Sequence, residues 1–69
     1  METVKIKTEY IELQQFLKLT NIISSGGAAK YYLKENECFV NGEKEDRRGR
    51  KLYPDYVVKV ENKEYLITK

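Results

Sequence analysis

The sequence concentrates positive charge in one short segment, "RRGRK", which places four cations in five positions. These cations are Arg47, Arg48, Arg50 and Lys51. An arginine guanidinium is a planar fork that matches phosphate oxygens and stacks on bases, whereas a lysine ammonium is a mobile point charge. Gly49 gives the segment the flexibility to follow a phosphate backbone. These residue types favour the binding of a polyanion.

The distribution of charge along the chain supports this interpretation. Residues 1–40 carry five basic and five acidic side chains, and residues 54–69 carry three of each. Residues 41–53 carry five basic and three acidic side chains, so the net charge of +2 resides there. In the alternative, the cluster is a solvated surface in which Glu43, Glu45 or Asp46 pairs with part of it. We favour nucleic-acid contact because the cluster holds the entire charge excess.

A second candidate lies in "SSGGAAKYYLK", which reads as the start of a helix with lysines one turn apart. Its candidate residues are Ser24, Ser25, Gly26, Gly27, Lys30 and Lys34. On a helix, the glycines and both lysines share one stripe, and the free amides at the helix start attract a phosphate. Glycines also let a sugar-phosphate backbone approach closely. The competing interpretation is a flexible cap before a solvated lysine face, and the segment taken alone favours it.

The six tyrosines suggest a surface on which bases could stack. Three of them, Tyr32, Tyr56 and Tyr65, fall where core positions are expected. Tyr31 and Tyr53 are expected to be exposed, so at most one or two rings could stack on bases.

Signatures of catalysis are absent from the sequence. There is no histidine, no glycine-rich phosphate loop ending in Lys-Ser or Lys-Thr, and no metal-ligand spacing. The lone Cys38 cannot form an internal disulfide, which fits a reducing cytoplasm, and we interpret it as a small apolar filler. No apolar stretch approaches the roughly 20 residues that span a bilayer, and no signal peptide is apparent. We expect a cytoplasmic binding protein without catalytic residues, metal or cofactor, and without a membrane or small-molecule partner.

The elements that must position these residues are short. Val4 and Ile6 alternate with lysines, which predicts an N-terminal strand. Apolar residues at helical spacing, Leu13, Phe16 and Leu17, predict a first helix over residues 9–20. A second helix should be capped by Ser24 or Ser25 and end at Asn36. Two helices with so short a linker must pack together as a helical hairpin.

The rest of the chain has the composition of strands. "CFVNGE" predicts a strand that ends in a turn at Asn41-Gly42, because both residues accept a positive φ at low cost. A second turn is expected at Pro54-Asp55, followed by the antiparallel strands "YVVKV" and "YLIT", joined around Asn62-Lys63. The order of strand, helix, helix and several strands predicts an α+β fold, and the 69 residues have the length of a single domain.

In their order and spacing, these pieces resemble an S4 domain. This RNA-binding module occurs in a ribosomal small-subunit protein, pseudouridine synthases, some tRNA synthetases and small stand-alone bacterial proteins, and the last group is the most similar. The matching positions are Leu13 and Leu17, Ser25, Ala29-Lys30, Val40-Asn41-Gly42, and Leu52 to Val57. Two departures stand out. Gly26 occupies the place where many S4 domains have an arginine, and Pro54-Asp55 replaces the usual Gly-Asp.

The resemblance implies the alpha-L fold of S4 domains, a helical hairpin packed on a small, mostly antiparallel sheet. It also implies binding of structured RNA, with ribosomal RNA, free or in the large subunit, as the partner in assembly or another ribosome-associated process. The implied RNA-binding residues are Ser24, Ser25, Gly26, Gly27, Lys30, Lys34, Asn41, Arg47, Arg48, Arg50 and Lys51. A DNA-binding module using the same helices and a small protein-interaction module remain alternatives.

Overall fold

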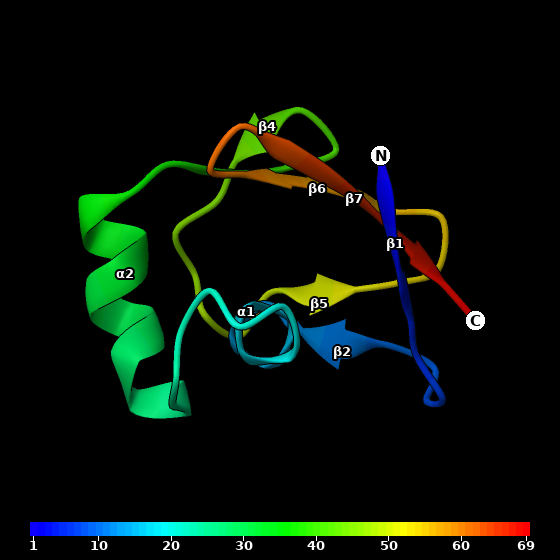
Figure 1. The fold of residues 1–69 in the computed structure, drawn as a ribbon, viewed down its shortest axis with the longest axis horizontal. Coiled ribbons are helices and arrows are strands. Elements are labelled where there is room, and N and C mark those ends of the chain that lie inside the picture. The colour runs from blue at the N-terminus through cyan, green and yellow to red at the C-terminus, as the bar shows by residue number, and fades with distance from the viewer.

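The computed structural model describes residues 1–69 and shows an α+β fold of short elements (Figure 1). The helical segments are α1 (Leu13–Leu19), a 3₁₀ turn η1 (Gly26–Ala28) and α2 (Ala29–Glu35). The strands are β1 (Glu2–Lys5), β2 (Ile11–Glu12), β3 (Cys38–Val40), β4 (Glu43–Lys44), β5 (Lys51–Leu52), β6 (Val57–Val60) and β7 (Lys63–Thr68). Neither helix has the length or the apolar composition that crossing a membrane requires.

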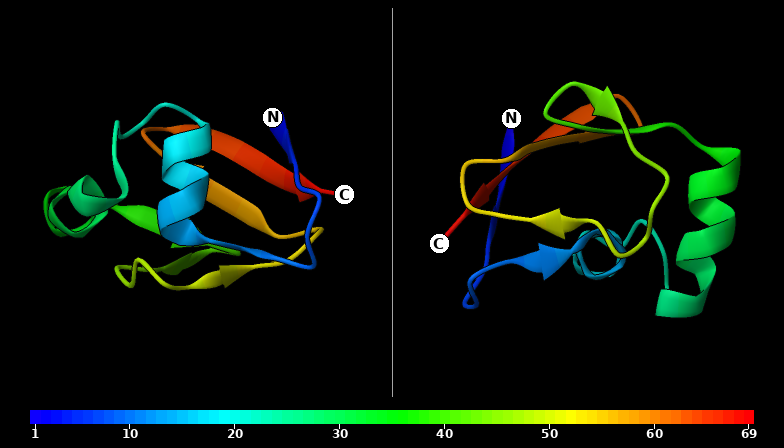
Figure 2. Two further views of the ribbon diagram at one scale, coloured as in Figure 1. Left: turned by 90° about the horizontal axis from the view of Figure 1, so that it is seen from below. Right: turned by 180° about the vertical axis from the view of Figure 1, so that it is seen from behind.

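Five strands form one sheet in the order β1-β7-β6-β3-β4, and β2 and β5 form a separate antiparallel pair. The larger sheet is antiparallel except at one edge, where β1 runs parallel to β7. Along β6 and β7 the buried residues alternate with more exposed ones, so that one face of the sheet closes the core. Helix α1 and the β2–β5 pair lie on that side, and α2 flanks it (Figures 1 and 2).

One core joins most of these elements but not β4, whose two residues are exposed. Fifteen buried hydrophobic residues form one cluster, with contributions from both helices and both sheets. Phe16 of α1 meets Tyr65 of β7 edge to face, with 5.2 Å between the ring centroids. Cys38 is fully buried in this cluster, and burial, followed by the charge of Glu45, raises its thiol pKa to about 11. The interpretation of Cys38 as an apolar filler is therefore confirmed.

The first helix is shorter than the periodicity predicts. Residues 9–12 are not helical, because Ile11 and Glu12 pair with Leu52 and Lys51 of β5. The helix begins after Glu12, whose backbone N–H donates to Gln15 Oε1 at 2.8 Å. It ends as predicted near Thr20 and Asn21, where Asn21 has a φ of 61°.

The second helix also differs at its start. Neither Ser24 nor Ser25 caps it with a side chain, because a 3₁₀ turn precedes it and Ala28 N–H donates to the Ser25 carbonyl instead. Its end at Asn36 is confirmed, since the Asn36 side chain donates to the Tyr32 carbonyl. In Figure 1 α1 is viewed along its axis while α2 lies in the plane, so the two helices form a steep corner and not the helical hairpin that the short linker predicts.

One long-range bond fastens α2 to the sheet. The Tyr32 hydroxyl donates to Oε2 of Glu61, a residue of the turn between β6 and β7, at 2.6 Å. Burial and this hydrogen bond both raise the pKa of Tyr32. Tyr65 is buried as expected, but Tyr32 and Tyr56 are only partly buried.

The turns are close to those predicted. Asn41 and Gly42 have φ values of 51° and 86°, which confirms the turn between β3 and β4. The turn between β6 and β7 is formed by Glu61 and Asn62, one residue earlier than predicted, because Val60 pairs with Lys63.

Candidate nucleic-acid interface

The basic segment predicted from the sequence is a fixed loop, which we call the arginine loop (residues 45–51). Glu45 N–H donates to the Cys38 carbonyl at 2.8 Å, which ties the start of the loop to β3. The carbonyls of Arg48 and Arg50 accept the N–H groups of Gln14 and Leu13 at 2.9 and 2.8 Å. These amides belong to the first turn of α1, where a helix has no internal acceptors. The backbone of the loop therefore caps α1 and is held in place by it.

The side chains of the loop are organised around Glu45. Its carboxylate is only 6% exposed and accepts the backbone N–H groups of Asp46 and Arg47. It also accepts hydrogen bonds from Nε and Nη2 of Arg47, each at 3.0 Å, and from Nη1 of Arg50 at 2.7 Å. The hydrogen bond from Arg47 is the largest influence on the pKa of Glu45, which is lowered to about 2. Glu45 is therefore ionised at neutral pH and fixes two guanidinium groups.

The remaining charge of the loop faces outward. The side chain of Arg47 is 73% exposed although it is paired with Glu45, and Arg50 is 25% exposed. Arg48 and Lys51 are exposed and make no ion pair. Of the three acidic candidate partners, only Glu45 pairs with the cluster, so cations remain free to meet an anion.

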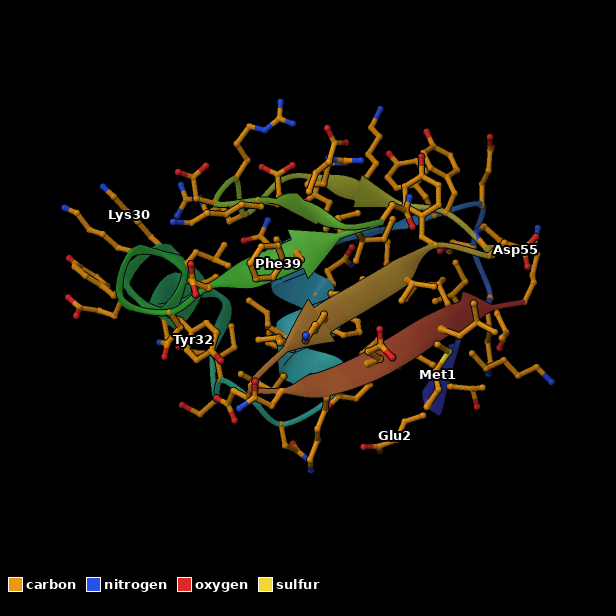
Figure 3. All side chains as sticks on the ribbon, turned by 90° about the horizontal axis from the view of Figure 1, so that it is seen from above. Met1, Glu2, Lys30, Tyr32, Phe39 and Asp55 are labelled. Atoms are coloured by element: carbon orange, nitrogen blue, oxygen red, sulfur yellow. The ribbon has the colours of Figure 1, made fainter.

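The candidate residues at the start of the second helix form a neighbouring group. Ser24, Ser25 and Gly27 are exposed, Gly26 is half-buried, and the amides of both glycines donate no hydrogen bond within the protein. Lys30 and Lys34 are exposed and make no ion pair. Figure 3 shows Lys30 projecting outward from α2. The views of Figures 1 and 2 agree that the arginine loop runs beside α2.

Asn41 does not join this group. The turn between β3 and β4 lies at the end of those strands away from α2 (Figures 1 and 2). Its side-chain oxygen accepts Val57 N–H at 2.9 Å, and its own N–H donates to the Val57 carbonyl at 2.8 Å. Both groups hold β3 to β6, so the contribution of Asn41 to RNA binding stays a prediction.

Two features of the site are missing from the sequence-based prediction. Glu45 was only one of three acidic candidates, and its burial depends on the whole fold. A row of three tyrosines, Tyr10, Tyr53 and Tyr56, lies against the loop. The sequence pattern gives no indication of a role for Tyr10 and predicts a core position for Tyr56. The sequence contains one signal for this row, the turn predicted at Pro54-Asp55, because such a turn brings the flanking Tyr53 and Tyr56 to the same side of the chain. No group of acidic or cysteine side chains converges to hold a metal ion.

Comparison with known proteins identifies the family to which the chain belongs. The family model described as S4 domain matches residues 4–68, so the chain belongs to the S4 domain family. The chain is also similar to a curated protein of Bacillus subtilis (strain 168), the "Probable ribosome maturation protein RlbA". The two are 55% identical over 58 residues, which is 84% of this chain and 82% of that protein.

Proposed function

We propose that this protein is a non-enzymatic RNA-binding protein that recognises structured ribosomal RNA during ribosome maturation or another ribosome-associated process. Membership of the S4 domain family and similarity to a protein named for ribosome maturation support this proposal. The observation that carries it is the arginine loop, whose backbone is hydrogen-bonded to α1 and in which Glu45 fixes two of the three guanidinium groups, those of Arg47 and Arg50. A cationic array that is ordered before binding loses little conformational entropy when it meets a phosphate backbone.

In the proposed mechanism, Arg48 and Lys51 bind phosphates directly and Arg47 and Arg50 extend the array at its inner edge. Lys30 and Lys34 on α2, with the free amides of Gly26 and Gly27 and the hydroxyls of Ser24 and Ser25, would meet an adjoining stretch of backbone. Such contacts recognise shape, because an A-form RNA helix hides its base edges in a deep, narrow groove. The alpha-L arrangement expected of S4 domains, and the action of residues 1–69 as one binding domain, belong to this proposal. One core that joins both helices and both sheets supports it.

The test is co-sedimentation of the protein with ribosomal subunits and their assembly precursors across a potassium chloride series. We expect binding to one particle that weakens as salt rises, because binding to phosphates releases counterions. In Arg48→Glu/Lys51→Glu, both cations that lack an ion pair are reversed and Glu45 keeps its partners. This variant should bind more weakly, and the slope of log K against log salt should become shallower by roughly 0.9 for each phosphate that is no longer neutralised.

The matched control is Lys5→Glu/Lys7→Glu, which changes the net charge by the same amount. Lys5 and Lys7 are exposed, make no ion pair and lie in or just after the edge strand β1, which Figure 1 shows on the side away from α2. If the two variants lose affinity equally, only net charge matters and the arginine loop is not the site. Equal affinity for a DNA duplex in competition would favour the DNA-binding alternative.

A further inference from the structure

The three tyrosines beside the arginine loop form a continuous row. The centroids of Tyr10 and Tyr53 are 5.5 Å apart and those of Tyr53 and Tyr56 are 5.7 Å apart, with both pairs tilted. All three rings are partly exposed, so the row is a surface feature rather than part of the core.

A turn fixes the two tyrosines nearest the loop. Tyr56 N–H donates to the Tyr53 carbonyl at 3.1 Å, with Pro54 and Asp55 between them. Asp55 has a φ of 76°, the conformation required at the third position of a type II turn, where proline commonly precedes it. Asp55 N–H donates to the Ile67 carbonyl at 2.7 Å, which fastens the turn to β7. The spacing of Tyr53 and Tyr56 is therefore built into the fold.

Two tyrosines of the row, together with the loop, line a shallow pocket that is open to solvent. Its lining consists of Arg47, Gly49, Arg50, Lys51, Tyr53 and Tyr56, and its volume is about 410 Å³. That volume lies within the range of roughly 300–1,000 Å³ typical of small-molecule sites. The lining combines aromatic rings with three cations and contains no acidic side chain.

Cations already lie over two of the three rings. Lys51 Nζ lies 5.0 Å from the centroid of Tyr10, and Arg50 Cζ lies 6.0 Å from that of Tyr56. Tyr53 packs between the other two rings and has no cation over it. Because Tyr53 is partly exposed and lines the pocket, we take it as the ring on which a ligand in the pocket would stack.

We propose that this pocket binds one unpaired nucleobase of the RNA, stacked on Tyr53, with the adjoining phosphate held by Lys51 and Arg47. The proposal rests on the proposed function and extends it, because the cationic array alone recognises backbone whereas this pocket would select RNA with an unpaired base. Aromatic stacking suits any base, since every base has a π-face, and the cations at the rim suit the phosphate that accompanies it.

The experiment compares two labelled probes by fluorescence anisotropy: a short, fully paired RNA duplex and the same duplex with one bulged adenosine. The wild-type protein should bind the bulged probe more tightly. Tyr53→Leu keeps an apolar side chain but removes the ring, so affinity for the bulged probe should fall about five- to 100-fold while duplex affinity is retained. Tyr53→Phe keeps the ring and should bind both probes as the wild type does.

The control is Tyr31→Leu, because Tyr31 is 69% exposed on α2 and its ring packs against no other aromatic ring. Thermal melting shows whether each variant is folded. A second measurement uses only the wild-type protein. The bulged adenosine of the probe is replaced by 2-aminopurine, whose fluorescence should be quenched when the protein binds.

The proposed base-binding role of the pocket is overturned if 2-aminopurine fluorescence does not change on binding. It is also overturned if Tyr53→Leu keeps full affinity for the bulged probe, or if this variant loses affinity equally for both probes. In those cases salt-sensitive binding of the wild type to ribosomal particles leaves the proposed function standing. A wild-type protein that binds neither probe and no ribosomal particle overturns the proposed function, and the pocket with it.

Discussion

Glu45 is the one charged residue that the fold buries, and its carboxylate bonds two arginines and two backbone amides. The negative charge of Glu45 should repel the phosphates of RNA, yet its hydrogen bonds hold Arg47 and Arg50 in place. The two effects have opposite signs, so the outcome of removing the charge identifies the larger one.

Glu45→Gln should lower both stability and RNA affinity. The amide is isosteric but uncharged, and its NH2 group replaces one of the two oxygens, each of which accepts at least two hydrogen bonds. We therefore expect a loss of about 1–3 kcal/mol in the free energy of unfolding, measured with urea. Glu43→Gln, an exposed neighbour in β4 without an ion pair, is the control and should change stability by less than about 0.5 kcal/mol. Higher RNA affinity in Glu45→Gln would mean that the carboxylate acts only as an opposing charge.

Acid should weaken the fold through the same carboxylate. The pKa of Glu45 is lowered from 4.5 to about 2 in the folded protein, so its stabilising contribution is complete above pH 4.5. That contribution is lost as the pH falls from about 4.5 to about 2. Urea midpoints of the wild type and Glu45→Gln should differ at pH 7 and converge across this range, and a constant difference would refute the assignment.

At the scale of elements, the arginine loop and α1 stabilise each other, because loop carbonyls accept the first amides of the helix. The sequence predicts a loop in which Gly49 supplies flexibility. In the structure Gly49 has no positive φ, and a Cβ placed on it would meet no atom within 4 Å. The loop is therefore held by hydrogen bonds that do not require glycine at this position.

Gly49→Ala should accordingly be tolerated and should raise stability by about 0.4–1 kcal/mol, because alanine has less freedom in the unfolded chain. Affinity for a fully paired RNA duplex should be unchanged, because the substitution removes none of the cations of the loop. Gly42→Ala is the contrasting variant: its φ of 86° is strained for alanine, so it should destabilise by about 1–2 kcal/mol. A loss of RNA binding in Gly49→Ala, without loss of stability, would show that the loop must flex to bind.

Elements governed by local chemistry could be predicted from the sequence. The alternation in β6 and β7, the Asn41-Gly42 turn and the stop at Asn36 depend on neighbouring residues, and the structure agrees with them. The first helix begins later than predicted because Ile11 and Glu12 pair with residues of β5, which lies far along the chain. A long-range partner of this kind leaves no trace in helical periodicity, and the same holds for the bonds between the arginine loop and α1.

At the scale of the whole molecule, the candidate residues divide into a group beside α2 and the separate Asn41. The charge asymmetry along the sequence predicts that the cations of the arginine loop lie at the surface, because a cluster of cations without enough acidic neighbours must remain there, and the structure agrees. Which cations stay unpaired depends on the burial of Glu45, and the tyrosine row depends on where β2 and β5 meet. Both are properties of the assembled fold.

The parallel pairing of β1 with β7 has a consequence for how the chain folds. It joins Glu2 to Tyr65 and Lys5 to Thr68, so the first strand of the sheet has no partner until the last strand has been synthesised. Ile6, which follows β1 and is buried in the core, donates its N–H to the Thr68 carbonyl, so it also lacks its partner until the end of β7 has been synthesised. Contacts this distant in sequence slow folding, and a nascent chain emerges from the ribosome with its sheet still open. The sheet can close only after Thr68 has emerged as well.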